Sequence, residues 1–232
     1  MTSPHFSVFV WGDLALFSRP DLRVERVSYP VITPSAARGV LEAIFWKPEF
    51  RYRLRQIDVV RPGAMVSVLR NEIKDRQGKT PVVVEQARTQ RTALMLRDVA
   101  YVLHADLELR PHATDPVAKY LDQAERHAGR GSCFHRPYLG TRECAAHFRL
   151  AEPGDGPDES FNLSIGPMLF DLAFVPGETK DGLSFRRQNG EGKRLVKGSA
   201  QPLYFDARVE KGVMAVPQDL YDQIDALEGH AA

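Results

Sequence analysis

The sequence predicts an α+β protein in which a ferredoxin-like, or RRM-like, domain over residues 1–150 precedes a small antiparallel β subdomain over residues 151–232. Two observations lead to this fold class. The elements expected in the first domain follow the order strand, helix, strand, hairpin, strand, helix, strand, which is typical of a ferredoxin-like sheet with both helices on one face. After residue 151, short strand patterns alternate with the turn sequences NGEG, KGSAQP and EKG, and a helical pattern returns in residues 217–227.

The strands of the first domain are expected from period-two patterns. Phe6, Val8 and Val10 alternate with other residues, so residues 5–11 should form a strand with one buried face. Similar patterns predict strands over residues 51–62, 99–111 and 145–153 and a hairpin over residues 65–88.

Two helices are expected between these strands. Residues 33–46 should form the first, with Thr33 as its N-cap, because its apolar residues fall on one helical face. Residues 115–129 should form the second, with Thr114 or Asp115 as its N-cap.

Composition narrows the class of protein. A chain of 232 residues with 43% hydrophobic content can bury its own core. It contains no run of about 18 apolar residues, and the start MTSPHFSVFV lacks the features of a signal peptide. We therefore expect a cytoplasmic protein, in which the two cysteines, Cys133 and Cys144, remain thiols.

Charge is unevenly distributed along the chain. The net charge is +1, but residues 51–91 hold ten cations and four anions, an excess of six positive charges. Acidic residues gather instead in 152–160 and after Pro217. Because a binding face is a local property, the basic segment is a candidate for phosphate contacts, with a solvated strand face as the alternative.

A zinc site at residues 133–147 is disfavoured by spacing. Cys133, His135, Cys144 and His147 are ligand types that zinc accepts, but a one-residue gap in an extended chain points Cys133 and His135 to opposite faces. The sequence therefore predicts no metal site and no cofactor. It also lacks the motifs G-x-S-x-G, G-x-x-x-x-G-K-[ST], H-E-x-x-H and G-x-G-x-x-G, which argues against a standard nucleotide-binding enzyme.

The segment AGRGSCFHRPYLG and its surroundings suit phosphates and bases. Arg130, Arg136 and Arg142 offer planar donors for phosphate oxygens. Aromatic surface for stacking could come from His135, Tyr138, Phe45 and Trp46. Core packing is the alternative for the aromatic residues, and it is favoured for Phe45.

Three longer stretches resemble a known family. VFVWGDLALFSRP, VERVSYPVITPSAARGVLEAIFWKP and GSCFHRPYLGTREC are similar to motifs of the CRISPR-associated Cas-five family, subtype I-C, the Dvulg or "d" variant. The resemblance covers most of residues 6–150 and is looser afterwards. It implies a repeat-associated RAMP-type ferredoxin-like domain, and an endoribonuclease that cuts CRISPR precursor RNA at the repeat hairpin and stays with the crRNA among the other subunits of the type I-C interference complex.

The chemistry implied by this resemblance is attack of a ribose 2′-hydroxyl on the adjacent phosphate, without a metal, giving a 2′,3′-cyclic phosphate. The family draws its catalytic groups from a tyrosine beside the first-helix tryptophan and from a lysine and a histidine early in the second helix. Here Phe45 stands at the tyrosine position, and Lys119 is followed by Tyr120 instead of histidine. Lys119 is thus the expected transition-state cation, Tyr120 a replacement phenol, and His127 and His135 candidate proton-transfer groups.

Candidate RNA-binding residues come from the basic segment, from AGRGSCFHRPYLG and its surroundings, and from the motif VERVSYPVITPSAARGVLEAIFWKP. They are Arg38, Trp46, Lys47, Arg70, Lys74, Arg76, Lys79, Arg130, Arg136 and Arg142. Two functions remain open at this point: the endoribonuclease, and a non-cutting crRNA-holding subunit with affinity for duplex DNA through the basic segment. A generic RRM-like RNA binder is less favoured, because no strand matches the RNP1 pattern.

Overall fold

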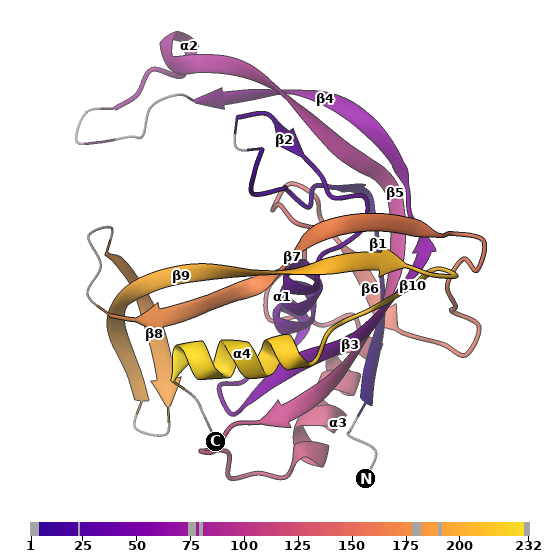
Figure 1. The fold of residues 1–232 in the computed structure, drawn as a ribbon, viewed down its shortest axis with the longest axis vertical. Coiled ribbons are helices and arrows are strands. Elements are labelled where there is room, and N and C mark those ends of the chain that lie inside the picture. Colours follow the sequence, from indigo (N-terminus) through magenta and orange to yellow (C-terminus); the bar gives the residue numbers. More distant parts are fainter. Residues whose placement is uncertain are drawn as a thin grey trace.

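The computed structural model describes residues 5–22, 24–73, 78, 81–177, 182–189 and 192–229. It confirms an α+β protein with mostly antiparallel sheets (Figure 1). Its strands are β1 (His5–Ala15), β2 (Arg26–Val27), β3 (Phe50–Arg61), β4 (Ala64–Ile73), β5 (Arg88–Leu109), β6 (His147–Leu150), β7 (Leu163–Pro176), β8 (Leu183–Asn189), β9 (Gly192–Val209) and β10 (Val213–Ala215). Its helices are α1 (Pro34–Ile44), α2 (Val84–Ala87), α3 (Val117–Gly129) and α4 (Asp219–Glu228).

The larger sheet has the strand order β10-β3-β5-β1-β6, and β2 and β4 also pair with β5. The long strand β5 pairs with β3 along its second half and with β4 along its first half. Gly63 lies between β3 and β4 with φ +78°, and a Cβ atom there would lie 2.6 Å from the carbonyl oxygen of Arg97. The change of direction between the two strands therefore requires glycine.

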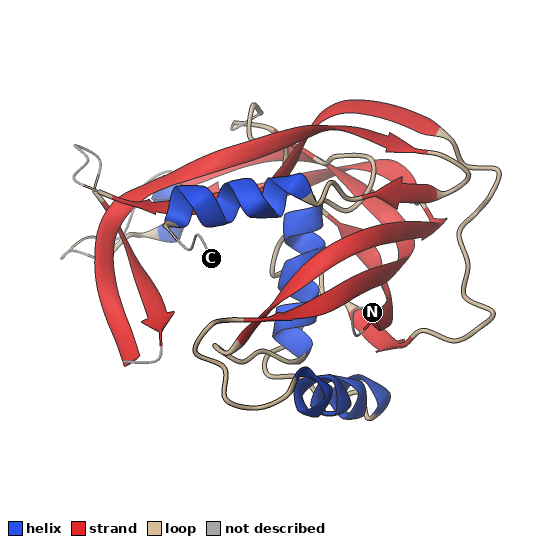
Figure 2. Cartoon of the chain, turned by 60° about the horizontal axis from the view of Figure 1, so that its bottom comes forward, coloured by secondary structure: helices blue, strands red, loops and turns tan. Residues whose placement is uncertain are grey.

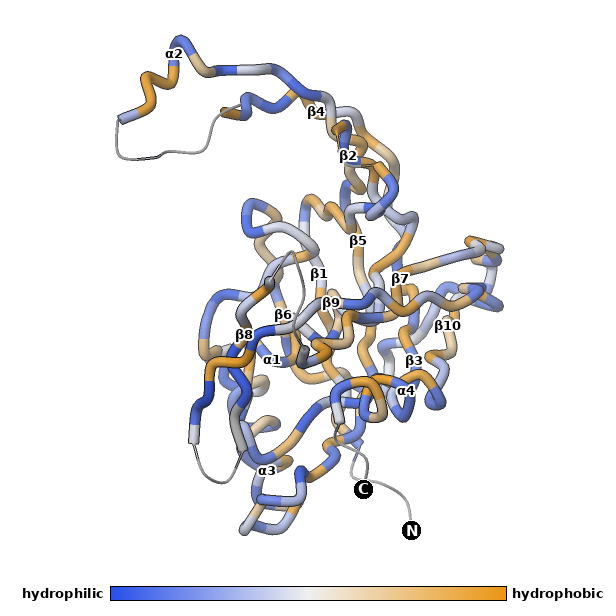
Figure 3. The backbone as a smooth tube through the Cα atoms, turned by 60° about the vertical axis from the view of Figure 1, so that its left-hand side comes forward, coloured by the Kyte–Doolittle hydropathy of each residue, from blue (hydrophilic) through white to orange (hydrophobic). Residues whose placement is uncertain are grey.

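One part of the predicted strand arrangement was wrong. The sequence predicted a hairpin over residues 65–88 and then a separate strand over residues 99–111. The second hairpin strand and the following strand are a single strand, Arg88–Leu109. The polar pair Arg97-Asp98 looks like a strand end in the sequence, but β5 continues through it with Asp98 at φ 60°. As a result β4 and the first half of β5 form an arm that projects from the body and carries both hydrophobic and hydrophilic residues (Figures 1 and 3).

Both predicted helices are present, with different ends. The Thr33 hydroxyl accepts a hydrogen bond from the Ala36 N–H at 3.2 Å, as expected of an N-cap, and α1 ends at Ile44 rather than at residue 46. Neither Thr114 nor Asp115 caps α3. Its N-cap is Pro116, without a side-chain hydrogen bond, and the Asp115 carboxylate accepts a hydrogen bond from Lys119 instead.

The main core lies between the larger sheet and the two helices. Phe6, Val8 and Val10 of β1 are buried there, as the alternating pattern predicted. Phe50 of β3 contacts Phe45, at the end of α1, and Tyr120 of α3, with ring centroids 5.7 and 5.5 Å away. Since one strand residue contacts both, α1 and α3 cover the same face of the sheet.

The smaller sheet has the order β7-β9-β8. The predicted turn KGSAQP was wrong, because residues 197–202 lie within β9, which runs unbroken from Gly192 to Val209. Two elements that follow this sheet in the chain contact β3 of the larger sheet. β10 pairs with β3, and the N–H of Leu54 in β3 donates to the Tyr221 hydroxyl of α4 at 2.9 Å. Figure 2 shows α4 beside the smaller sheet, with α1 next to it and α3 further away.

Across the described residues, no helix is both long enough and apolar enough to span a membrane.

Candidate functional site

Several candidate residues meet where α1 ends beside α3. Phe45 follows the last residue of α1, and its ring centroid lies 5.2 Å from that of His127 on α3. Phe50 connects Phe45 to Tyr120, so these aromatic side chains form one continuous cluster. The structure thereby brings together Phe45, which is expected at the position of the family tyrosine, and two of the four residues expected to be catalytic.

The loop after α3 lies over the same end of α1. The backbone N–H groups of Phe134 and His135 donate to the Ala43 carbonyl oxygen at 2.8 and 3.1 Å. The Ser132 N–H donates to the His127 carbonyl oxygen at 2.9 Å. These bonds hold an exposed His135 side chain at the same end of the helix as Phe45.

Lys119 and Tyr120 are neighbours in sequence but differ in environment. Lys119 is exposed, and its ammonium group donates to Asp115 at 2.8 Å, which raises its pKa and keeps it charged. Tyr120 is 4% exposed, and burial raises the pKa of its phenol. A phenol of this kind stays protonated at neutral pH, so it can donate a proton but is unsuited to act as a base.

Two buried polar atoms near this cluster have no hydrogen-bond partner among the described residues. They are Nδ1 of His127 and Oε2 of Glu49. The carboxylate of Glu49 contributes, after burial, to the raised pKa of Tyr120. An unpartnered imidazole nitrogen is available for proton transfer. Glu49 was not identified from the sequence, because a glutamate after Pro48 looks like an ordinary loop residue.

Two of the expected RNA-binding arginines are held by carboxylates. Arg38 donates to both oxygens of Asp171, at 2.7 and 3.0 Å, and to Glu42 at 2.7 Å. Arg70 forms an ion pair with Glu143. The guanidinium group of Arg38 is thus occupied through all three of its nitrogens, whereas that of Arg70 donates through one nitrogen.

The other candidate cations are more open. Lys47, Arg130, Arg136 and Arg142 are exposed, and none has an ion pair within the described parts of the chain. Trp46 is 39% exposed. Lys74, Arg76 and Lys79 lie outside the described residues. The structure therefore leaves Trp46 and these four cations accessible to solvent.

Much of the positive charge of residues 51–91 is compensated in three dimensions. The arginines of β3 form ion pairs with acidic residues that are distant in sequence. These pairs are Arg51 with Glu108 and Asp225, Arg53 with Glu108 and Asp222, Arg55 with Asp106, and Arg61 with Asp98. The β3 part of the segment is consequently not a free basic face.

The four residues weighed as zinc ligands occupy different environments. Cys133 is exposed, whereas Cys144 is buried, and burial raises the pKa of the Cys144 thiol. His147 stacks on Trp11 with ring centroids 5.5 Å apart. Within the described ranges, no group of three or more His, Cys, Asp or Glu residues is placed to hold a metal ion.

Comparisons with known proteins show the family of this chain. The sequence model of the family described as "CRISPR-associated protein (Cas_Cas5)", in its Cas5d form, matches residues 8–217. The chain belongs to this family. The Cas5d assignment extends the resemblance seen in residues 6–150 into the second half of the chain.

Two curated relatives of this Cas5d chain are each named "CRISPR pre-crRNA endoribonuclease Cas5d". The protein from Thermus thermophilus is 56% identical over 225 residues, covering 97% of this chain and 96% of the relative. The protein from Mannheimia succiniciproducens is 36% identical over 230 residues, covering 90% of this chain and 92% of the relative. Both similarities extend over nearly the whole chain.

Solved structures support the fold. A functionally uncharacterized protein, SMU1763c from Streptococcus mutans, aligns with a TM-score of 0.61 at 19% identity, covering 94% of each chain. A structure described as a CRISPR-associated protein aligns with a TM-score of 0.61 at 20% identity, covering 93% of this chain and 92% of that one. At such identities the likeness concerns the fold alone.

Proposed function

We propose that this chain is a pre-crRNA endoribonuclease that cuts CRISPR precursor RNA at the repeat hairpin and remains bound to the crRNA as a subunit of the type I-C interference complex. The observation that carries this proposal is the 56% identity, over 97% of the chain, to a relative named as such an endoribonuclease. Other subunits of that complex are its expected protein partners, and its place of action is the cytoplasm.

The reaction is attack of a ribose 2′-oxygen on the adjacent phosphorus. A 2′,3′-cyclic phosphate forms, the bond to the 5′-oxygen breaks, and the departing oxygen takes a proton to become a 5′-hydroxyl. Three tasks follow: removal of the 2′-proton, protonation of the 5′-oxygen, and stabilisation of the charge on the five-coordinate phosphate.

We assign these tasks to residues of α3 and of the loop that follows it. Lys119 stabilises the phosphate charge, because its ammonium group is exposed and stays protonated. His127 and His135 transfer protons, since each presents an imidazole near the end of α1. Tyr120 serves as a proton donor in place of the phenol that Phe45 lacks, in keeping with the raised pKa of its hydroxyl.

We further infer that residues 1–150 form a ferredoxin-like domain of the RAMP type and that residues 151–232 form a β-rich subdomain. The strand order β3-β5-β1-β6, with α1 and α3 on one face, supports the first part. The separate sheet β7-β9-β8 supports the second, although β10 pairs across the proposed boundary.

Incubation of the purified protein with repeat RNA in EDTA tests this function. We expect cleavage to yield a product ending in a cyclic phosphate, and no cleavage of RNA with 2′-deoxyribose at the cut site. Tight binding of repeat RNA without any cleavage would instead support a non-cutting, crRNA-holding subunit, consistent with Phe45 at the position of the family tyrosine. Cleavage that requires added metal would contradict the proposed mechanism.

A further inference from the structure

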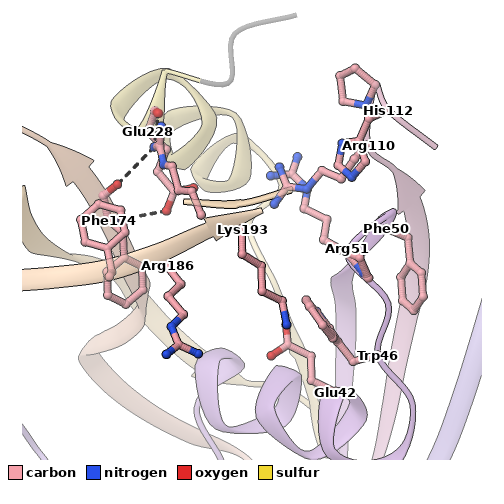
Figure 4. Close-up of a pocket in the computed structure, with 14 residues that line it drawn as sticks. Glu42, Trp46, Phe50, Arg51, Arg110, His112, Phe174, Arg186, Lys193 and Glu228 are labelled. Carbon is pink, nitrogen blue, oxygen red and sulfur yellow. Dashed lines mark hydrogen bonds between the residues drawn. The ribbon is translucent and has the colours of Figure 1, made fainter. Parts of the chain in front are cut away.

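A cavity of about 670 Å³ opens between the two sheets, next to the candidate catalytic cluster. One wall comes from α1 and the chain just after it, with Glu42 and Trp46, and the opposite wall comes from β7, β8 and β9. Figure 4 shows Trp46 directed into this space from the end of α1. Phe50 also lines the cavity and contacts both Phe45 and Tyr120, so the cavity adjoins the candidate cluster.

The lining combines aromatic rings with positive charge. Aromatic side chains line the cavity from four separate segments of the chain. They are Trp46, Phe50, Phe174 and Phe185. Five basic residues line the same cavity, against two acidic ones. The volume falls within the range of about 300–1,000 Å³ that is usual for small-molecule sites. This chemistry suits a ligand with a flat ring and an anionic group.

Not all of the positive charge is compensated by the protein. Arg51 forms ion pairs with Glu108 and Asp225, which neutralise it. Arg110 comes within 3.7 Å of an oxygen of Asp225 that Arg51 already binds. Burial and the nearby charge of Arg51 lower the pKa of Arg110, which is the expected result when a guanidinium group has too little counter-charge. An anion placed beside Arg110 would relieve this deficit.

Two further cations reach the cavity from the smaller sheet. Arg186 lies on β8 and Lys193 on β9, and in Figure 4 both side chains extend towards α1, Lys193 in the direction of Glu42. Arg186 forms no ion pair with another described residue. The β8 and β9 strands thus place positive charge opposite Trp46.

We infer that this cavity binds one unpaired nucleotide of the RNA, with its base stacked on Trp46 and its phosphate held by Arg110, Arg186 and Lys193. The inference rests on the proposed function for the identity of the ligand as RNA. A base within a duplex already stacks on its neighbours, so an aromatic pocket favours a nucleotide that is single-stranded. Capture of such a nucleotide next to Phe45 would fix the position of the adjacent phosphate for cleavage.

The stacking contact is tested with uncleavable repeat RNA that has 2′-deoxyribose at the cut site. The fluorescent base 2-aminopurine is placed in turn at each unpaired position near the cut. We expect quenching on binding at one position, loss of that quenching in Trp46→Ala, and its retention in Trp46→Phe. Removal of the base at that position should weaken binding to the parent by about 5- to 100-fold, with a much smaller effect in Trp46→Ala.

The proposed contact between Lys193 and a phosphate can be tested against a matched control residue in the same strand. Lys193 lines the cavity, whereas its neighbour Arg194 does not. Because successive side chains of a strand point to opposite faces, Lys193→Gln and Arg194→Gln remove equal charge on different sides of β9. Lys193→Gln should reduce the slope of log affinity against log salt by the amount expected for the loss of about one phosphate contact. Arg194→Gln should leave the slope unchanged.

The nucleotide pocket and the endoribonuclease activity can each be disproved without the other. If no 2-aminopurine position distinguishes the parent from Trp46→Ala, or if Lys193→Gln and Arg194→Gln behave alike, the nucleotide pocket is wrong even when cleavable RNA is cut. If the parent binds and quenches as expected but does not cut cleavable RNA, the pocket stands and the endoribonuclease assignment fails. Equal affinity of the parent and Trp46→Ala for RNA that lacks this base shows that the Trp46→Ala result does not come from misfolding.

Discussion

The imidazole ring of His127 lies 5.2 Å from the phenyl ring of Phe45, and its Nδ1 atom is buried without a hydrogen-bond partner among the described residues. From the family resemblance of its sequence, Phe45 is expected to stand at the position of a catalytic tyrosine. A side chain that can carry a proton, that of His127 on α3, therefore lies beside Phe45. It is more than two helical turns beyond Lys119.

Replacement of His127 by alanine should lower the single-turnover cleavage rate by about 100-fold or more, because a positioned proton carrier contributes at least that much. RNA affinity should change little. His147→Ala is the matched control, since His147 also packs on an aromatic ring, that of Trp11, but outside the α1–α3 junction. Equal rates in parent and His127→Ala would transfer the proton-transfer role to His135.

Lys119 should act on the transition state more than on binding. Lys119→Ala is expected to reduce the single-turnover rate by about 100-fold or more, with less than a tenfold change in RNA affinity. The control is Arg126→Ala, because Arg126 lies on the same helix and forms a similar ion pair, at 3.0 Å, with Asp122. Parallel losses of rate and affinity in Lys119→Ala would make Lys119 a phosphate anchor.

Arg38 should contribute more to stability than to RNA binding. Removal of its guanidinium group in Arg38→Met would leave Asp171, which is 7% exposed, without its bidentate partner. Breaking a buried pair in this way costs about 3–5 kcal/mol, which urea unfolding would measure. The double variant Arg38→Met/Asp171→Leu should recover part of the loss. Unchanged stability together with weaker RNA binding would contradict this assignment.

The basic residues in β4 and just after it should supply affinity that does not depend on RNA sequence. Neutralising Arg70, Lys74, Arg76 and Lys79 together should flatten the dependence of log affinity on log salt, because fewer counterions are released. Arg70→Gln by itself should have a smaller effect, since Arg70 is paired with Glu143. An identical slope in the fourfold variant would place these residues away from the RNA.

Stability should fall at alkaline pH through buried tyrosines. Burial raises the pKa of Tyr221 to about 12, above the value of about 10 expected in the unfolded chain. Because the folded-state pKa of Tyr221 lies above the unfolded one, its contribution to the free energy of unfolding is complete below pH 10. That contribution is lost as pH rises towards 12. Urea unfolding at pH 9, 10 and 11 should show this loss, and Tyr221→Phe should reduce it. A loss of the same size in that variant would point to other groups.

The sequence by itself determined those features that depend on neighbouring residues. Thr33 specified the start of α1 through a hydrogen bond three residues away, and the alternation of Phe6, Val8 and Val10 specified the buried face of β1. Motifs such as GSCFHRPYLGTREC indicated the family for the same reason, because they are contiguous. Lys119 and His127 could be named from the sequence, although their catalytic roles remain predictions.

Only the tertiary structure decided the features that join distant residues. β5 continues past Arg97-Asp98 because β3 and β4 pair with its two halves, and the local pattern does not contain that pairing. Arg38 looked like a free cation until Asp171, 133 residues away, was placed beside it. The cavity likewise combines Trp46, Arg110 and Lys193 from separate parts of the chain. Side-chain charge and ring geometry act through space, so a site of this kind exists only once the two sheets are brought together.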